Sequence, residues 1–407
     1  MGKFIEYEYY FCIITDNNVP NYLPFIMNKS LVNKANIILL ISDKMRNSYT
    51  PFKELIESKN HEIQLIYFNN SDDFSTKLIE ELTRQEYQKN KILFNITGGT
   101  KSMSIRSFIA GMQTNCENIN YMLIDQDKNS TIEFFDQSGT SSFEQGNKYN
   151  LKIKDYLSIY KTNIIKDIIT SNQVTSDQTE FINNLIKFPD RELKIIIKLF
   201  NELNGICRDE KNNDQNENFN FKFPSDKIVK FKPLLDSLYD YKIIKNTVNH
   251  LNEEIIFNDR NTHKFSTGGW LELYVYKILE KMKKEHPDVI SDLELNLYLN
   301  YSKYNEKQPH HELDVVFIAN SRMYFIECKT GMQVINDYNQ IIEKTGYLEN
   351  KLKAKSKIVT TKTKNEILQG NPHRNNFDKL VEKNQLLDLD NLTYHSFKQQ
   401  ILTWIDS

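Results

Sequence analysis

The chain has 407 residues, of which 26% are charged, and its formal net charge is −2 at pH 7. This length predicts two or three domains, and the near-neutral balance excludes a protein that binds nucleic acid through a global basic field. The sequence has no C-x-x-C pair, signal-peptide pattern or apolar run of transmembrane length, so we expect a cytoplasmic protein without zinc, disulfides or a membrane partner.

The first 136 residues alternate between apolar runs and helical patterns. The runs at 9–15, 36–42, 62–68, 91–97, 120–125 and 131–136 predict strands, and the patterns at 73–90 and 101–115 predict helices. Near-continuous apolar strands separated by helices indicate a mostly parallel α/β sheet that is covered on both faces. Ligands of such sheets bind at the carboxyl ends of the strands, at the point where the strand order reverses.

The segment 95–102, NITGGTKS, joins a predicted buried strand to a helix. Gly98 and Gly99 allow the backbone to approach a ligand closely, and the helix N-terminus offers free N–H groups to an anion. Lys101 adds a positive charge, but no glycine immediately precedes it, so the segment is not a Walker A loop. We therefore expect an anion site that serves neither ATP hydrolysis nor a dinucleotide. A plain capped turn is the alternative.

The run ITGGTKSMS after a buried strand resembles the ligand motif of CARF domains, the CRISPR-associated Rossmann folds. The end of the first strand, ITDN at 14–17, resembles their other ligand loop. The resemblance covers about residues 1–150 and implies a dimeric sensor of a cyclic oligoadenylate, with cyclic tetra-adenylate favoured. A symmetric dimer suits a ring of phosphates, because it presents two helix N-termini and two lysines across one axis. The implied activator site contains Thr15, Asp16, Gly98, Gly99, Thr100 and Lys101, with Ser42 and Asn69 as further candidates or, alternatively, helix caps.

Residues 151–260 predict a connecting segment. The stretch 151–204 is helical in pattern, and 208–218 is polar and of low complexity, which indicates a surface loop. The stretch 225–257 looks like a helix followed by a hairpin between YKIIKNTV and EEIIFND. A winged helix-turn-helix that binds DNA is one interpretation. We prefer a rigid spacer, because no basic recognition helix is evident.

Two apolar runs around the polar break at Asn320-Ser321 predict a β-hairpin. A turn symmetric about that break places Asp314 directly opposite Glu327, and opposed residues have Cβ atoms roughly 4.5–5.5 Å apart. Like charges at that distance repel each other, so the pair favours a cation between them. The alternation of side chains along a strand puts Lys329 on the same face as Glu327 and turns Cys328 into the core.

Two carboxylates form a hard oxygen site that suits Mg²⁺ or Mn²⁺. Such an ion orients a water, lowers its pKa and neutralises charge on a phosphodiester, while Lys329 holds or deprotonates the water or stabilises the phosphorus centre. The spacing D-x(12)-E-x-K resembles the PD-(D/E)xK nuclease superfamily, although Leu313 replaces the frequent proline. The segment GGWLE at 268–272 opens a helical pattern, and the resemblance makes Glu272 the third carboxylate. The implied catalytic set is Glu272, Asp314, Glu327 and Lys329, with the three carboxylates as metal ligands.

Other interpretations stay open in this half. Glu327 and Lys329 are, alternatively, a solvated cross-strand pair, and His310 and His311 are extra ligands or exposed residues at a strand entry. Gln340 is a candidate for a substrate or water contact. The lysines of KLKAKSKIVTT at 351–361 either follow a phosphate backbone or form a solvated basic face.

The expected architecture is α/β, with a Rossmann-like CARF domain at 1–150, the connector at 151–260 and a restriction-endonuclease-like α/β/α domain at 261–407. The implied protein is a homodimeric, metal-dependent nuclease of DNA or RNA, activated by a cyclic oligoadenylate in type III CRISPR antiviral defence. One alternative is a non-enzymatic sensor or transcription factor that binds DNA through the middle segment. Another is a restriction-type nuclease whose N-terminal fold binds a different nucleotide. The motif does not encode a contact to the 2′-hydroxyl, so the choice between DNA and RNA stays open.

Overall fold

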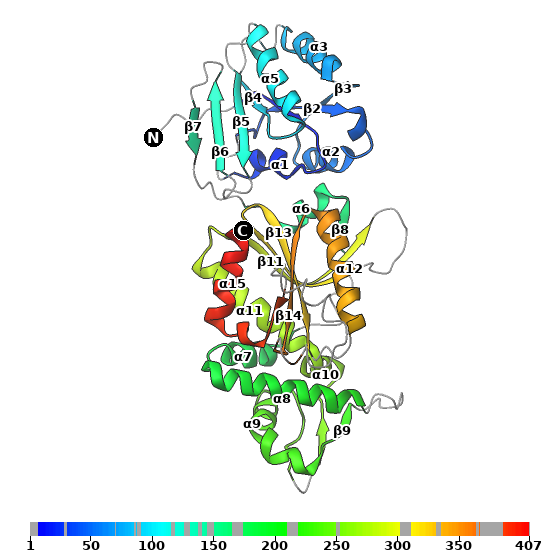
Figure 1. Cartoon of the computed structure of the whole chain (residues 1–407), viewed down its shortest axis with the longest axis vertical. Coiled ribbons are helices and arrows are strands. Elements are labelled where there is room, and N and C mark those ends of the chain that lie inside the picture. The colour runs from blue at the N-terminus through cyan, green and yellow to red at the C-terminus, as the bar shows by residue number, and fades with distance from the viewer. Residues whose placement is uncertain are drawn as a thin grey trace.

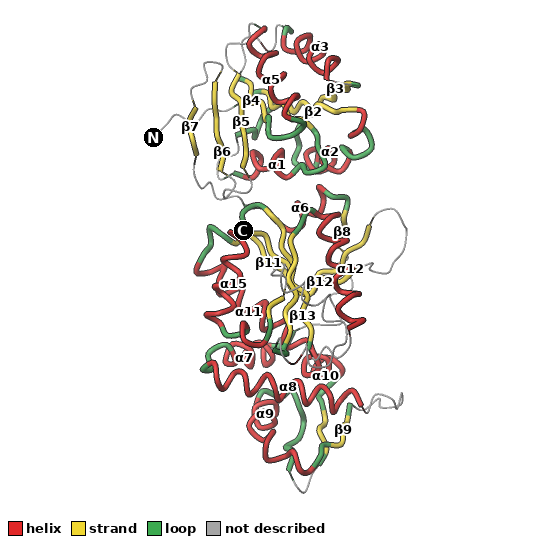
Figure 2. Tube along the Cα trace, in the orientation of Figure 1, coloured by secondary structure: helices red, strands yellow, loops and turns green. Residues whose placement is uncertain are grey.

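Three structural units follow one another along the molecule (Figure 1, Figure 2). An N-terminal sheet lies at one end, a second sheet lies in the middle, and a small helical unit lies at the other end. No helix within the described parts of the chain is long and apolar enough to cross a membrane. The structure is a computed structural model that describes residues 7–27, 31–69, 71–84, 87, 91–114, 119–125, 131–136, 141–144, 150–164, 174–209, 219–249, 253–301, 311–330, 335–363, 366 and 386–406.

The N-terminal sheet has the strand order β3-β2-β1-β4-β5-β6-β7. The strands from β3 to β5 are parallel, and β6 and β7 add an antiparallel edge. This mostly parallel sheet confirms the prediction, and all six apolar runs coincide with strands. The chain returns to the other side of β1 after β3, so the strand order reverses between β1 and β4. The bounds are β1 (Tyr9–Ile13), β2 (Asn36–Ser42), β3 (Ile63–Phe68), β4 (Ile92–Asn95), β5 (Ile119–Asp125), β6 (Thr131–Asp136) and β7 (Ser141–Glu144).

Helices cover both faces of this sheet because strand side chains alternate between two apolar clusters. Cys12 and Leu39 pack with α1 and α2, whereas Phe11 and Leu40 pack with α3 and α5. Both predicted helices are present, and the predicted helix at 73–90 ends at Leu82 within α3. The bounds are α1 (Val19–Ile26), η1 (Asp43–Met45), α2 (Thr50–Glu57), α3 (Ser71–Leu82) and α5 (Lys101–Gln113).

The second sheet has the order β15-β14-β13-β12-β11-β8 and forms an α/β/α sandwich. One face packs on α11 and α15, and the other face packs on α12 and α6. The strands are antiparallel from β8 to β13 and parallel from β13 to β15. The bounds are β8 (Thr162–Ile164), β11 (Ile290–Tyr301), β12 (His311–Ala319), β13 (Arg322–Lys329), β14 (Lys355–Thr360), β15 (Leu386–Leu387), α6 (Ile153–Ile159), α11 (Trp270–Glu285), α12 (Ile335–Leu352), η6 (Leu389–Asn391) and α15 (Tyr394–Asp406).

The third unit packs three helices around a two-stranded sheet. A short helix, α10, runs through a π-helical turn at Phe265–Gly269 into α11, so the unit is continuous with the second sheet's helical layer. The bounds are α7 (Ser176–Leu185), α8 (Asp190–Asp209), β9 (Asn220–Lys222), η4 (Ser225–Lys227), α9 (Ile228–Asp240), β10 (Glu254–Ile256) and α10 (Arg260–Lys264).

Two predictions about the connector are wrong. The expected hairpin partner of β10, at 241–248, makes only an isolated bridge between Ile244 and Phe257, and β10 pairs with β9 instead. The Asn246 side chain bonds Glu254 O and Ile256 N, and thereby takes backbone groups that a strand would use. The helical pattern of 151–204 predicts a helix at Ile164, but Ile164 lies in β8. The edge of β11 is open to pairing there. Residues 210–218 of the predicted polar loop lie outside the described residues.

Candidate functional sites

Two loops of the N-terminal sheet meet where its strand order reverses. A Cβ atom on Gly98 would lie 2.4 Å from the carbonyl oxygen of Ile13 and 3.0 Å from Cγ2 of Thr15. Gly99 has a φ of +81°, a conformation that L residues rarely adopt. The loop after β4 therefore lies directly against the loop after β1, and only glycine fits at this contact.

A buried asparagine network holds both loops in place. Asn95 donates to Asn21 Oδ1 at 3.0 Å and accepts from the Thr97 amide at 3.0 Å. Asn21 in turn donates to Asn18 Oδ1 at 3.0 Å, and Asn18 and Thr15 exchange two hydrogen bonds, at 3.1 Å and 2.8 Å. Buried amides retain such bonds because an unpaired polar group is costly inside a protein. The sequence does not single out Asn18 or Asn21, whose positions in a helix-like stretch give no signal.

The rest of the predicted anion site surrounds the start of α5. Thr100 is its N-cap and accepts from the Met103 amide at 3.3 Å, and Lys101 is exposed in the first turn. Ser42 ends β2 and Asn69 directly follows β3 at the same edge of the sheet, and Asp16 is exposed on the loop after β1. The Ser42 hydroxyl makes no capping hydrogen bond to η1. The structure thus gathers all eight predicted residues at one end of the parallel strands.

The hairpin of β12 and β13 has the predicted register. Its turn residues, Asn320 and Ser321, both have positive φ, which matches the twist of the flanking strands. Paired residues run from Ala319 with Arg322 to Val315 with Ile326, and this register, continued by one residue, sets Asp314 opposite Glu327. Both carboxylates are buried, with exposed fractions of 6% and 1%.

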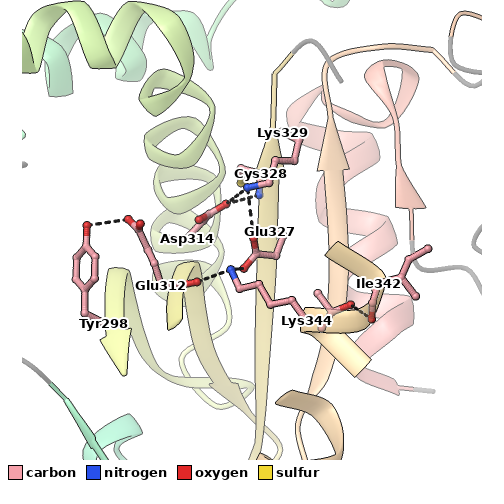
Figure 3. Close-up of polar contacts among 9 residues, drawn as sticks. Tyr298, Glu312, Asp314, Glu327, Cys328, Lys329, Ile342 and Lys344 are labelled. Atoms are coloured by element: carbon pink, nitrogen blue, oxygen red, sulfur yellow. Dashed lines mark hydrogen bonds and ion pairs between the residues drawn. The ribbon is translucent and has the colours of Figure 1, made fainter. Parts of the chain in front are cut away.

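Lys329 lies between these two carboxylates (Figure 3). Its Nζ is 3.5 Å from Asp314 Oδ2 and 3.4 Å from Glu327 Oε2, and Asp314 Oδ2 also accepts from the Cys328 amide at 2.6 Å. Burial and the charge of Glu327 raise the pKa of Asp314 to about 6. Burial lowers the pKa of Lys329, but the facing carboxylates outweigh it and hold that pKa above its ordinary value. Cys328 points into the core, as predicted.

Lys344 enters the same site from α12. Its Nζ is 2.6 Å from Glu327 Oε1 and 2.6 Å from the carbonyl oxygen of Glu312. Figure 3 shows this side chain reaching from the helix toward β13. Glu312 also accepts from the Tyr298 hydroxyl at 2.8 Å. The sequence does not single out Lys344, because helical periodicity does not say which side chain will meet a distant strand.

Glu272 lies in the first turn of α11, which starts after the kink at Gly268. With its amide oriented to donate, Asn296 lies 3.1 Å from Glu272 Oε2 and 3.2 Å from the carbonyl oxygen of Asp314. Asn296 has a φ of 53° and interrupts the pairing of β11 with β12. Such a conformation is uncommon outside glycine and often occurs at functional sites. Burial, followed by the charges of Asp314 and Glu312, raises the pKa of Glu272 to about 8.

A pocket of about 310 Å³ opens beside Glu272, and its lining includes Asn296, Glu312, Lys264 and Gln178. The pocket therefore reaches the Glu272 and Glu312 side of the site. The ligand atoms that Glu272, Asp314 and Glu327 offer are carboxylate oxygens, which fit Mg²⁺ or Mn²⁺ rather than zinc. Within the described ranges, however, no three acidic, histidine or cysteine side chains are already placed as metal ligands.

Two family models match the chain. The Card1 CARF domain model matches residues 10–156, and the Card1-like endonuclease domain model matches residues 259–395. The chain therefore contains a CARF domain and an endonuclease domain of the Card1 kind. Protein VC1899 from Vibrio cholerae shares 17% identity and a TM-score of 0.74, with 98% of each chain covered. Can2 from Sulfobacillus thermosulfidooxidans, solved in complex with cyclic tetra-adenylate, shares 21% identity and a TM-score of 0.68, with 99% of each chain covered. These likenesses show the fold, and a comparison with curated proteins finds no match.

The CARF domain model spans every predicted activator residue, and the endonuclease domain model spans Glu272, Asp314, Glu327 and Lys329. The remaining candidates lie at the margin of the nuclease site. His311 starts β12 with its ring 5.8 Å from that of Tyr347, and Gln340 is exposed on α12. Lys357 is buried and lies 5.1 Å from the Trp404 ring, so it is not part of an exposed basic face. His310 and Cys116 lie outside the described residues, and Cys12, Cys207 and Cys328 are buried.

Proposed function

We propose that this CARF nuclease is a metal-dependent enzyme that hydrolyses DNA, RNA or both when its CARF domain binds a cyclic oligoadenylate. Cyclic tetra-adenylate is the favoured activator, the bound ring of Can2 being the precedent. The observation that carries the proposal is the coexistence of two sites in one chain. One is a glycine-lined helix N-terminus at the switch point, which suits an anion, and the other is a buried carboxylate–lysine cluster. We place its action in the cytoplasm, in type III CRISPR antiviral defence.

The nuclease site has the groups that phosphodiester hydrolysis requires. Glu272, Asp314 and Glu327 would hold Mg²⁺ or Mn²⁺, which when bound supplies an activated water and neutralises charge on the phosphate. The Cys328 amide fixes the Asp314 carboxyl group at the end of the hairpin. Lys329 carries a raised pKa, so it acts as a cation that stabilises charge on the phosphate rather than as a base.

A homodimer is part of the proposal because α5 presents an exposed apolar stripe. Ile105, Ile109 and Met112 have exposed fractions of 60%, 44% and 58%, and their spacing puts them on one side of the helix. Contiguous exposed apolar residues of this kind mark interaction surfaces. A second copy related by a two-fold axis would cover the stripe and bring a second anion site beside the first.

A cleavage assay tests this function. Purified protein with Mg²⁺ or Mn²⁺ is mixed with supercoiled plasmid, single-stranded DNA or RNA, with and without cyclic tetra- and hexa-adenylate. We expect cleavage only with metal and one ring. Asp314→Ala should lower the rate at least 100-fold and leave ring affinity unchanged. Lys101→Ala should weaken ring binding about tenfold, the effect of one lost charged hydrogen bond, and should be rescued by excess activator.

Full activity of Asp314→Ala would place the catalytic site elsewhere. Ring binding without cleavage of any substrate would instead favour the non-enzymatic sensor.

A further inference from the structure

Both oxygens of the buried Glu327 carboxylate are occupied by lysines. Lys329 lies 3.4 Å from Oε2, and Lys344 lies 2.6 Å from Oε1. A short ion pair to a carboxylate that is 1% exposed is a strong contact, because little water competes for it. A metal ion therefore has to displace the Lys344 ammonium group before it can bind Glu327 Oε1.

Lys344 differs from Lys329 in where it comes from. Lys329 is on the same strand as Glu327, whereas Lys344 is on α12, which packs over the face of the sheet that carries Met323 and Phe325. The C-terminal end of α12 lies eight residues further on, about 12 Å along the helix axis. At that end the Tyr156 hydroxyl donates to the carbonyl oxygens of Leu352 and Lys353, at 2.9 Å and 3.1 Å.

Tyr156 belongs to α6, which also contacts the predicted activator loop. The Tyr156 ring lies 5.2 Å from that of Tyr160, and the Tyr160 hydroxyl donates to Asn17 Oδ1 at 2.9 Å. Asn17 directly follows Thr15 and Asp16, and its amide donates to Thr15 Oγ1 at 3.1 Å. A continuous series of contacts thus runs from the activator loop through α6 and α12 to the Glu327 carboxylate.

We propose that Lys344 is a positioning residue that holds Glu327 away from metal in the activator-free chain. Binding of the ring reorders the loop at Thr15 and Asn17, and α6 transmits the change to α12, which withdraws Lys344. The inference rests on the proposed function. It adds that the activator regulates metal binding rather than access of the substrate. The ion pair and the metal compete for one carboxylate oxygen, so a modest shift of α12 changes the balance between them.

Mn²⁺ affinity without nucleic acid tests this step, with free Mn²⁺ followed by electron paramagnetic resonance in the presence and absence of cyclic tetra-adenylate. The activator should tighten Mn²⁺ binding to the unmodified chain. Lys344→Met should bind Mn²⁺ at least tenfold more tightly than the unmodified chain without activator, and should no longer respond to it. Lys344→Arg keeps the charge and should behave like the unmodified chain. Lys351→Met, two turns further along α12, is the matched control and should change nothing.

Tyr160→Phe tests the connection to the activator loop. This variant should still bind the ring but lose most of the activator's effect on Mn²⁺ affinity. Tyr67→Phe, which removes a hydrogen bond to Tyr49 within the CARF domain, is its control.

Equal Mn²⁺ affinities for Lys344→Met and the unmodified chain would overturn the role of Lys344 while leaving the proposed nuclease intact. A response to activator that survives in Lys344→Met would overturn it as well. Failure of every form to bind Mn²⁺, with or without activator, would overturn both the role of Lys344 and the metal dependence.

Discussion

Glu272 and Asp314 keep their protons over a pH range in which the unfolded chain has lost them. Glu272 and Asp314 have raised pKa values because burial and neighbouring negative charges disfavour their ionised forms. Two lysines and one amide offset this repulsion only in part. Under the proposed function, a divalent cation would offset the repulsion that remains.

The pH dependence of stability follows from this arrangement. The pKa of Glu272 is about 8 in the folded chain and 4.5 for an ordinary glutamate, so between these values the folded state holds a proton that the unfolded state has lost. The free energy of unfolding should therefore fall as pH rises from about 5 to about 8, by on the order of 4 kcal/mol. Asp314 adds a change of the same sign up to about pH 6.

Urea unfolding in metal-free buffer between pH 5 and 9 measures this effect. Glu272→Gln should remove most of the fall, whereas Glu343→Gln, on the exposed side of α12, should retain it. The same slope in Glu272→Gln as in the unmodified chain would contradict the assignment.

Sequence patterns predict the residues of the site that lie close together along the chain. Asp314, Glu327 and Lys329 follow from strand alternation and a symmetric turn, both of which are local properties. Asn296 reaches the site because its own positive φ interrupts the pairing of β11 with β12. The residue type alone does not predict that interruption. Lys344 depends on how α12 lies across the sheet, which is decided by tertiary packing.

At the scale of elements, the loop after β4 depends on its contact with β1. A Cβ atom on Gly98 would be 2.4 Å from the backbone oxygen of Ile13, so Gly98→Ala forces two backbones apart. We expect it to lower the free energy of unfolding by about 1–3 kcal/mol and to abolish measurable ring binding by calorimetry. Gly205→Ala is the matched control, because nothing lies within 4 Å of a Cβ atom there and alanine favours the α8 helix. Ring affinity unchanged in Gly98→Ala would remove this loop from the activator site.

Strands and helices can be predicted where the sequence has a continuous apolar run or apolar residues at helical spacing. Apolar runs predict six of the seven strands of the N-terminal sheet, and they also predict the hairpin of β12 and β13. The pairing of β10 with β9 cannot be predicted from such patterns. It joins segments more than 30 residues apart, and the Asn246 side chain bonds backbone groups of β10 that a hairpin partner would use. The short strand β8 pairs with β11, which is more than 130 residues away in the sequence. Local sequence patterns do not predict such a pairing.

At the scale of the whole molecule, the α5 stripe predicts the oligomeric state. Ile109→Lys would place a charge in the proposed dimer interface, so we expect a monomer by light scattering and a large loss of ring affinity. Val229→Lys is the control, since Val229 on α9 is 75% exposed and lies outside that stripe. A dimer that persists in Ile109→Lys would move the interface elsewhere.

The connector's first residues belong structurally to the nuclease rather than to a free tether. Ser291 donates to the Leu151 carbonyl, the Ile153 amide donates to Asp292, and β8 completes the edge of the second sheet. A junction placed at residue 260 in a chimera would therefore leave an edge strand attached to the wrong partner. We therefore expect sensor domains to be exchangeable between relatives only at a junction before Leu151. The same constraint applies to natural recombination that joins a sensor domain to a new effector domain.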